Sequence, residues 1–363
     1  VEKTPVYVNP AACISMSIAE DPRGPFIPAS LYDSSTYSQS SLVRYVWTKD
    51  SSAVKSDSAI GYIGCYNQAG GSWSQGFGCI DPEFVYDIAT GQLVTYTVGE
   101  NACYGILYGS WKGGLALVFV DAETFKPVCT AAGTSTFDGR TYSVGDEMDA
   151  PLDSVSGNQG KKIAGGRGTA YEGAQLVYNS DTSRYYLFVS MGDLTYQYRV
   201  GVGRSQEVTD FTPAALPTAY YDASGRDMNA VVDTTGSSLY YHNVGSKIIG
   251  AHCLSGEYGI TSPGGLSICR ASDGKILFAN HARTTYAGSG NFLLQVHQLF
   301  FTDDGWPLLN QNDYYDEAAA LPELSLSDIA GSYQVILTRR STDTEADGSA
   351  TESQTMTISE DGS

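Results

Sequence analysis

Two carboxylates stand immediately ahead of apolar, aromatic-rich runs. Asp81 lies in GFGCIDPEFVYD and leads through a proline into Phe84–Tyr86, and Glu172 lies in GTAYEGAQLVYN ahead of a longer run. An Asp before a proline is a common turn residue, and a Glu in this place can belong to the surface of an edge strand. A carboxylate held at the mouth of a sheet can instead do chemistry, because partial burial raises its pKa. Both interpretations are open from these residues alone.

Antiparallel β-sheets must position these carboxylates. The chain has 26 Tyr and 40 Gly in 363 residues, a composition typical of β-rich proteins. Alternating runs of about five to eight residues, separated by turn residues, predict strands; they fall in 13–19, 92–98, 114–121, 174–192, 198–205, 228–245, 264–270, 275–283 and 292–309. NSDTSRYY and DTTGSS indicate hairpin turns, and YDEAAALPE at best a short turn of helix. So many strand pairs suit a propeller better than a single sandwich.

Charge and cysteine usage exclude several classes of partner and site. The net charge is −19, which repels phosphate backbones and disfavours nucleic acid, but leaves a neutral polymer or a small ligand possible. Seven cysteines without a C-x-x-C pair argue against a zinc or redox motif, and their pairing stays open. No apolar run approaches the roughly 18 residues of a membrane helix. The chain starts at Val1 without a Met or a signal peptide, which indicates processing or a fragment.

A break near EAAALPELS divides the chain. Residues 1–320 are expected to form one domain, and residues 324–363 the opening strands of a small β-barrel or sandwich that is incomplete at Ser363. The polar, acidic segment 341–353 is expected to be an exposed loop.

Five segments follow one another along the chain, and their order matters as much as their composition: CIDPEFVYDIATGQLVTYTVG, YGILYGSWKGGLALVFVDAETFKP, GTAYEGAQLVYNSDTSRYYLFVSMGDL, YRVGVGRSQEVTDF and FANHARTTYAGSGNFLLQVHQLFFTDDGWPLL. Together, over residues 81–309, they resemble glycoside hydrolase family 43, and within it the endo-1,5-α-L-arabinanases. The residues from Leu324 onward resemble the accessory domain of larger arabinanases. The resemblance implies an all-β fold, a five-bladed β-propeller followed by a partial β-barrel accessory domain.

The resemblance also implies inverting hydrolysis, in which two carboxyl groups stand roughly 6.5–9.5 Å apart with room for a water. It implies that Glu172 is the general acid and that Asp81 modulates its pKa by like-charge proximity. The family's general-base Asp precedes the Ile-Asp-Pro segment and is not found in this chain, where it should lie upstream of Val1. Asp21 stands in the pattern of an exit turn instead. A second departure is Met228, where the family often has a His.

For binding, the resemblance implies that His281 lies at the propeller axis beside a cation, Ca²⁺ or Na⁺, with mostly water ligands. A buried His bonded to a backbone carbonyl is the alternative. Trp111, beside Ser110, is expected to stack on a sugar ring, with a core Trp as the alternative. Asn229 and Arg283 are further candidates for sugar contacts.

The expected protein is therefore a monomeric, extracellular or periplasmic endo-arabinanase that cleaves the α-1,5-linked backbone of arabinan or arabino-oligosaccharides. An exo-acting arabinosidase or β-xylosidase of the same family is an alternative, since segments 131–166 and 245–263 could close one end of the cleft. A non-catalytic, glycan-binding propeller is a third reading, because the base is not visible.

Overall fold

The computed structural model describes residues 17–28, 80–98, 100–110, 114–123, 134–137, 140–143, 161–164, 171–192, 194, 198–208, 211, 246–255, 259–284, 292–315, 324–336 and 351–361. Nearly all regular structure in them is β-strand, which confirms the all-β class. Their helix α2 (Leu326–Ile329) has four residues, and no helix in the described ranges is long and apolar enough to cross a membrane.

A six-stranded sheet, which we call the middle sheet, carries Glu172. Its order is β15 (Ser246–Ile249), β14 (Arg199–Ser205), β13 (Arg184–Met191), β12 (Tyr171–Asn179), β4 (Tyr86–Asp87) and β5 (Gln92–Leu93). Its neighbouring strands run antiparallel except β12 and β4, which pair in parallel. Asn179 pairs with Arg184 across the turn of NSDTSRYY, so that predicted hairpin is confirmed.

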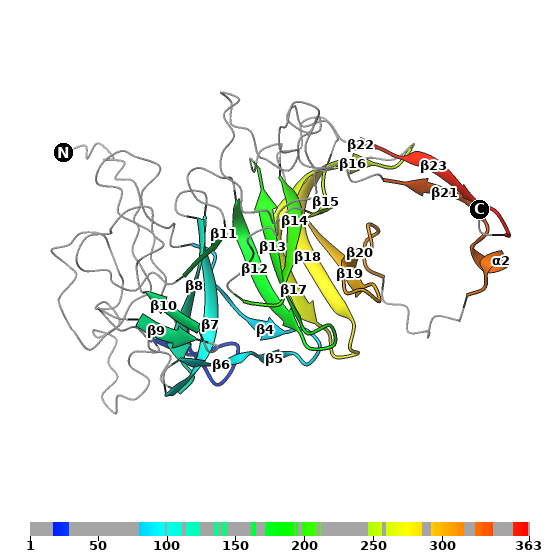
Figure 1. The fold of residues 1–363 in the computed structure, drawn as a ribbon. Helices are drawn as coiled ribbons and strands as arrows, with labels where there is room; N and C mark the ends of the chain where they lie inside the picture. Colours follow the sequence, from blue (N-terminus) through cyan, green and yellow to red (C-terminus); the bar gives the residue numbers. More distant parts are fainter. Residues whose placement is uncertain are drawn as a thin grey trace, which may run out of the picture.

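Two further large sheets lie on either side of the middle sheet (Figure 1). The first sheet has the order β10 (Arg140–Ser143), β9 (Thr134–Phe137), β6 (Thr95–Val98), β7 (Asn101–Ser110), β8 (Gly114–Asp121) and β11 (Lys161–Ala164), with β3 (Glu83–Phe84) also paired to β7. The third sheet has the order β20 (Pro307–Leu309), β19 (Leu293–Phe301), β18 (Ile276–Thr284), β17 (Ile260–Arg270), β16 (His252–Cys253) and β22 (Thr351–Glu352). Two small pairs complete the strands: β1 (Ser17–Ile18) with β2 (Ile27–Pro28), and β21 (Gly331–Val335) with β23 (Gln354–Ile358).

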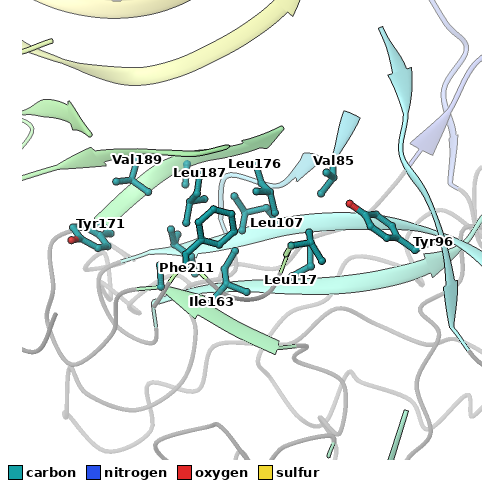
Figure 2. Packing of buried hydrophobic residues seen from close by; sticks show 14 of the residues in the cluster. Val85, Tyr96, Leu107, Leu117, Ile163, Tyr171, Leu176, Leu187, Val189 and Phe211 are labelled. Atoms are coloured by element: carbon teal, nitrogen blue, oxygen red, sulfur yellow. The ribbon is translucent and has the colours of Figure 1, made fainter. Parts of the chain in front are cut away.

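The middle sheet is apolar on both faces. Successive side chains of a strand point to opposite faces, so an uninterrupted apolar run buries both. Leu176 and Leu187 pack with residues of the first sheet in the cluster that Figure 2 shows. Val177 and Phe188, one position along each strand, pack with Phe278 and other residues of the third sheet. This two-sided burial fixes the register of β12 and, with it, the direction of Glu172.

The segment that follows Asp81 belongs to two sheets at once. β3 pairs with β7 of the first sheet, and β4, which begins only two residues after β3 ends, pairs with β12 of the middle sheet. The return strand divides in the same way: β5 pairs with β4 and β6 with β7, with Val94 donating its backbone N–H to the carbonyl of Val85 between them. Asp81 therefore stands at the junction of the first and middle sheets.

A side-chain amide joins the middle and third sheets. Gln175 on β12 donates from Nε2 to the carbonyl oxygen of Ile268 on β17 at 3.2 Å, and it accepts at Oε1 from the Ile268 backbone N–H at 2.5 Å. Gln175 is 2% exposed, so both of its polar atoms find buried partners. The hydroxyl of Tyr86 donates to the same Ile268 carbonyl. These bonds hold β17 at a fixed position along β12.

The sequence predictions can be compared with these elements where the structure describes them. The run 114–121 coincides with β8, and runs 198–205 and 292–309 contain β14 and the β19–β20 hairpin. The run 275–283 covers β18 except for its last residue, Thr284. The run 228–245, DTTGSS within it, and residues 316–323 of the short helical turn lie outside the described residues. Near the C-terminus β21 and β23 are strands as expected, whereas the residues just before them form α2.

Loss of side-chain volume in the cluster of Figure 2 is expected to be costly. Leu187 is fully buried there, so Leu187→Ala should lower the free energy of unfolding by about 2–5 kcal/mol through lost burial and a residual cavity. Leu308→Ala is the matched control, because that leucine is 55% exposed and should change the free energy by less than about 0.5 kcal/mol. Urea unfolding curves of both variants check this, and equal losses would contradict the packing described above.

Candidate active site

Asp81 is bonded across the junction of two sheets rather than within its own turn. Its Oδ2 accepts a hydrogen bond from the backbone N–H of Gly173 at 3.2 Å, a contact between residues 92 positions apart. Its φ of 53° lies in the left-handed region, which Asp tolerates better than most residues with a side chain. The structure therefore brings Asp81 to the residue that follows Glu172, as the sequence predicts.

Glu172 sits beside a β-bulge in β12. The pairing of β12 with β13 shifts between Glu172 and Gln175, and Gly173 within the bulge has a φ of 50°. Bulges of this kind re-aim side chains near functional sites. Glu172 is half-buried, and its Oε1 accepts a hydrogen bond from the hydroxyl of Tyr198, which precedes β14. The half-burial of Glu172 and its hydrogen bond do not favour the alternative of a free surface residue on an edge strand, and β12 as a whole lies between β13 and β4.

A second irregular strand, β17, meets this bulge. Its pairing with β18 shifts on both sides of Gly264, and Gly265 has a φ of 58°. A Cβ at Gly173 would lie 3.4 Å from the Cα of Gly265, so the two backbones approach closely. The backbone N–H of Gly265 donates to the Ser190 hydroxyl at 2.9 Å and ties β17 to β13. Two bulged strands from different sheets thus border the two carboxylates.

The electrostatics favour protonation of Asp81 and Glu83. Burial raises the pKa of Asp81, and the hydrogen bond from Gly173 opposes part of this rise. The pKa of Glu83, two residues further along, is also raised, first by burial and then by the charge of Asp81. The site therefore contains a third carboxyl group that sequence reasoning missed, although its i, i+2 spacing from Asp81 could have signalled it.

His281 on β18 lies in an aromatic setting. Its ring is stacked with Tyr198, with centroids 5.8 Å apart, and the ring of Phe292 meets it edge-on at 4.5 Å. Burial lowers the pKa of His281, and the charge of Arg283 lowers it further. Its Nδ1 is buried, and no hydrogen-bond partner for it lies within the described part of the chain. The alternative interpretation, a histidine bonded to a backbone carbonyl, fits His297 instead, whose Nδ1 lies 3.0 Å from the Asn312 carbonyl oxygen.

The lowered pKa of His281 predicts a dependence of stability on pH. Below about pH 6.5 the unfolded chain binds a proton at this histidine more readily than the folded protein does, so the free energy of unfolding falls as the pH falls through that window. His281→Gln should therefore lose less in Tm between about pH 7.5 and 5 than the parent protein. Arg283→Gln should give an intermediate slope, because it removes the smaller cause. An unchanged slope in His281→Gln would contradict the assignment.

The remaining predicted site residues are partly beyond what the structure describes. Arg283 is described: its guanidinium lies 4.4 Å from the centroid of the Phe292 ring. Ser110 ends β7, but its side chain, together with all of Trp111 and Asn229, lies outside the described residues. Asp21 is exposed to solvent and pairs with Arg23 at 2.8 Å, which lowers the pKa of Asp21 to about 2 and agrees with a turn.

Several residues of the site carried no signal that sequence reasoning used. The sequence predicts Tyr198 as the start of the strand run 198–205 and Phe292 as the start of the run 292–309, with no role in the site. Gly264 and Gly265 open the predicted strand run 264–270, and paired glycines inside a strand pattern signal close backbone approach. For a metal, the described residues bring together no group of three His, Cys, Asp or Glu side chains that could hold an ion.

Known proteins resemble this chain in both sequence and fold. Over 242 residues it is 30% identical to the extracellular endo-α-(1→5)-L-arabinanase of Thermotoga petrophila, covering 64% of this chain and 43% of that protein. Over the same length it is 29% identical to the extracellular endo-α-(1→5)-L-arabinanase 2 of Bacillus subtilis, covering 64% of this chain and 44% of the relative. The chain is endo-arabinanase-like. Its resemblance to glycoside hydrolase family 43 is confirmed.

Solved structures agree on the fold of this endo-arabinanase-like chain. The endo-1,5-α-L-arabinanase of Thermotoga petrophila superposes with a TM-score of 0.61 at 23% identity, covering 96% of this chain and 63% of that one. A family 43 glycoside hydrolase from Bacillus licheniformis gives 0.60 at 20% identity with the same coverage. No protein-family model matches the chain. The endo-arabinanase-like chain spans less than half the length of the curated relatives it matches.

Proposed function

We propose that this protein is an extracellular endo-α-1,5-L-arabinanase that hydrolyses the backbone of arabinan with inversion. The observation that carries the proposal is the hydrogen bond from the backbone N–H of Gly173, the residue that follows Glu172, to Asp81 in an endo-arabinanase-like chain. The similar proteins of Thermotoga petrophila and Bacillus subtilis, both named extracellular endo-arabinanases, support the substrate and the location.

In this proposal Glu172 is the general acid. Its proton passes to the glycosidic oxygen as the bond from that oxygen to the anomeric carbon breaks, and a water supplies the new hydroxyl on the opposite face. Asp81 keeps Glu172 protonated before the reaction through like-charge repulsion. The water gives its proton to a further carboxylate, for which Asp21 is a poor candidate because its ion pair with Arg23 makes it a weak base.

We also propose the finer architecture that the family resemblance implies. Residues 1–320 form a five-bladed β-propeller, which the three large sheets support, and residues 324–363 belong to an accessory domain. His281 is the residue that would hold an axial Ca²⁺ or Na⁺, because its buried Nδ1 has no hydrogen-bond partner among the described residues. With a single protein ligand, such an ion would be bound mainly by water. When bound, it would add positive charge near the carboxylates.

The proposal is tested with purified complete protein and linear α-1,5-arabinan. An endo-acting enzyme releases reducing ends together with oligosaccharides of mixed length, and the viscosity of the solution falls early. Release of a single short product would favour the exo-acting alternative. No release, with retardation of the protein in a gel that contains arabinan, would favour a glycan-binding protein. Proton NMR of the first products reads the anomeric configuration and tests inversion.

A further inference from the structure

Tyr198 contacts Glu172 from a buried position. The tyrosine is 5% exposed and lies one residue before β14, and its hydroxyl donates a hydrogen bond to Oε1 of Glu172. It reaches Glu172 from a segment separated from it by 26 positions in the chain. A buried donor of this kind restricts the rotamers of the carboxyl group it binds, because leaving the hydroxyl unpaired would be costly.

The ring of Tyr198 packs against Gly264 and against the ring of His281, which itself packs against Gly265. A Cβ at Gly264 would lie 2.2 Å from Cδ2 of Tyr198, so the ring can pack there only against a residue without a side chain. A Cβ at Gly265 would lie 2.6 Å from Nε2 of His281. The rings of His281 and Tyr198 are themselves stacked with an interplanar angle of 26°. The bulged part of β17 thus accepts two aromatic rings side by side, and they hold the phenol facing Glu172.

We propose that Tyr198 is the positioning residue of the general acid, an inference that rests on the proposed function. A hydroxyl that donates to Oε1 leaves Oε2 as the oxygen that carries the acidic proton of Glu172. Tyr198 keeps its own proton throughout, and the proton on Oε2 is the one that passes to the glycosidic oxygen. The hydroxyl therefore fixes both the rotamer of Glu172 and the oxygen from which the proton leaves.

Removal of this hydroxyl should impair protonation of the leaving group selectively. Tyr198→Phe is expected to lower kcat on linear arabinan by about 10- to 100-fold with KM changed by less than about threefold, because only the transition state uses the correctly aimed proton. A 2,4-dinitrophenyl glycoside of an α-1,5-arabino-oligosaccharide has a leaving group that departs without a proton. Its hydrolysis by the same variant should fall by less than about threefold.

A second buried tyrosine provides the matched control. Tyr186 is fully buried, and its hydroxyl donates to the carbonyl of Gly305 at 2.6 Å, a bond to a residue outside the proposed site. Tyr186→Phe deletes the same atom and is expected to lower Tm while leaving kcat on both substrates within about twofold of the parent.

Two outcomes would overturn the role of Tyr198: arabinan turnover within about twofold of the parent, or equal losses on both substrates, which a merely structural role would give. If Tyr198→Phe does not fold, Gly264→Ala is used instead, because its added methyl group must displace the ring of Tyr198. Its loss of turnover on arabinan is then compared with its loss on the dinitrophenyl glycoside. Glu172→Gln is measured in parallel. An active Glu172→Gln would refute the proposed function itself, whereas an inactive one beside a fully active Tyr198→Phe would refute only the positioning role.

Discussion

Glu172→Gln is expected to lower kcat on linear arabinan by about 100- to 10,000-fold, the range that loss of a general acid produces. Glutamine has nearly the same shape as a protonated glutamic acid and can still accept a hydrogen bond from Tyr198, so the fold around β12 should persist. Its amide cannot deliver a proton to the glycosidic oxygen. Reducing-sugar release by the purified complete protein measures the loss.

Glu123→Gln serves as the control for this variant. Glu123 is exposed just beyond the end of β8, outside the candidate site, and its substitution should leave turnover within about twofold of the parent. Activity of Glu172→Gln within about tenfold of the parent, with an unchanged Tm, would contradict the assignment of Glu172 as the acid.

Asp81→Asn is expected to separate activity from stability. Turnover should fall by about 100-fold, because the neutral amide no longer keeps Glu172 protonated. Stability at neutral pH should not fall with activity. An acid whose pKa is raised on folding binds its proton more tightly in the folded protein, so its contribution is lost as the pH rises through the folded pKa and becomes a penalty at neutral pH. Tm at pH 7 should therefore be equal to or above that of the parent.

The control for Asp81→Asn is Asp273→Asn, for which the expected change in Tm at pH 7 has the opposite sign. Asp273 is exposed, and its hydrogen bonds with Lys275 lower its pKa, so its charge stabilises the folded protein above the unfolded pKa. Asp273→Asn should lower Tm slightly at pH 7 and leave turnover unchanged. If Asp81→Asn instead lost activity and Tm together, Asp81 would be a structural residue of the sheet junction.

Strands could be predicted best from the sequence where buried residues form a long apolar run. Strand β8 could be predicted to the residue, and the β12–β13 hairpin could be predicted from its turn residues, because these strands are long apolar runs bounded by turn residues. α2 could not be predicted in the same way, since LSLSDIAG alternates like a strand. There Asp328 accepts from the backbone N–H of Ser325 at 2.8 Å, and this local bond favours a helical turn over strand pairing.

Non-local pairing limited the prediction elsewhere. The run 92–98 reads as one strand, yet β5 and β6 belong to different sheets, because their partners β4 and β7 are set by packing that no short window contains. The same limit applies to the site. Asp81 and Glu172 each precede an apolar run and could be recognised, whereas Tyr198 reaches Glu172 only through the bulge of β17 at Gly264.

The amide of Gln175 has a consequence for redesign of this protein. It bonds both backbone atoms of Ile268, as a neighbouring strand would, and so sets where the glycine pair of one sheet stands relative to the acid of the next. A library that seeks new substrate preferences can vary the loops freely while position 175 is held constant. To transplant the carboxylates to another scaffold, β12 and β17 must be moved together, because the bonds between Gln175 and Ile268 that align the two strands need both of them.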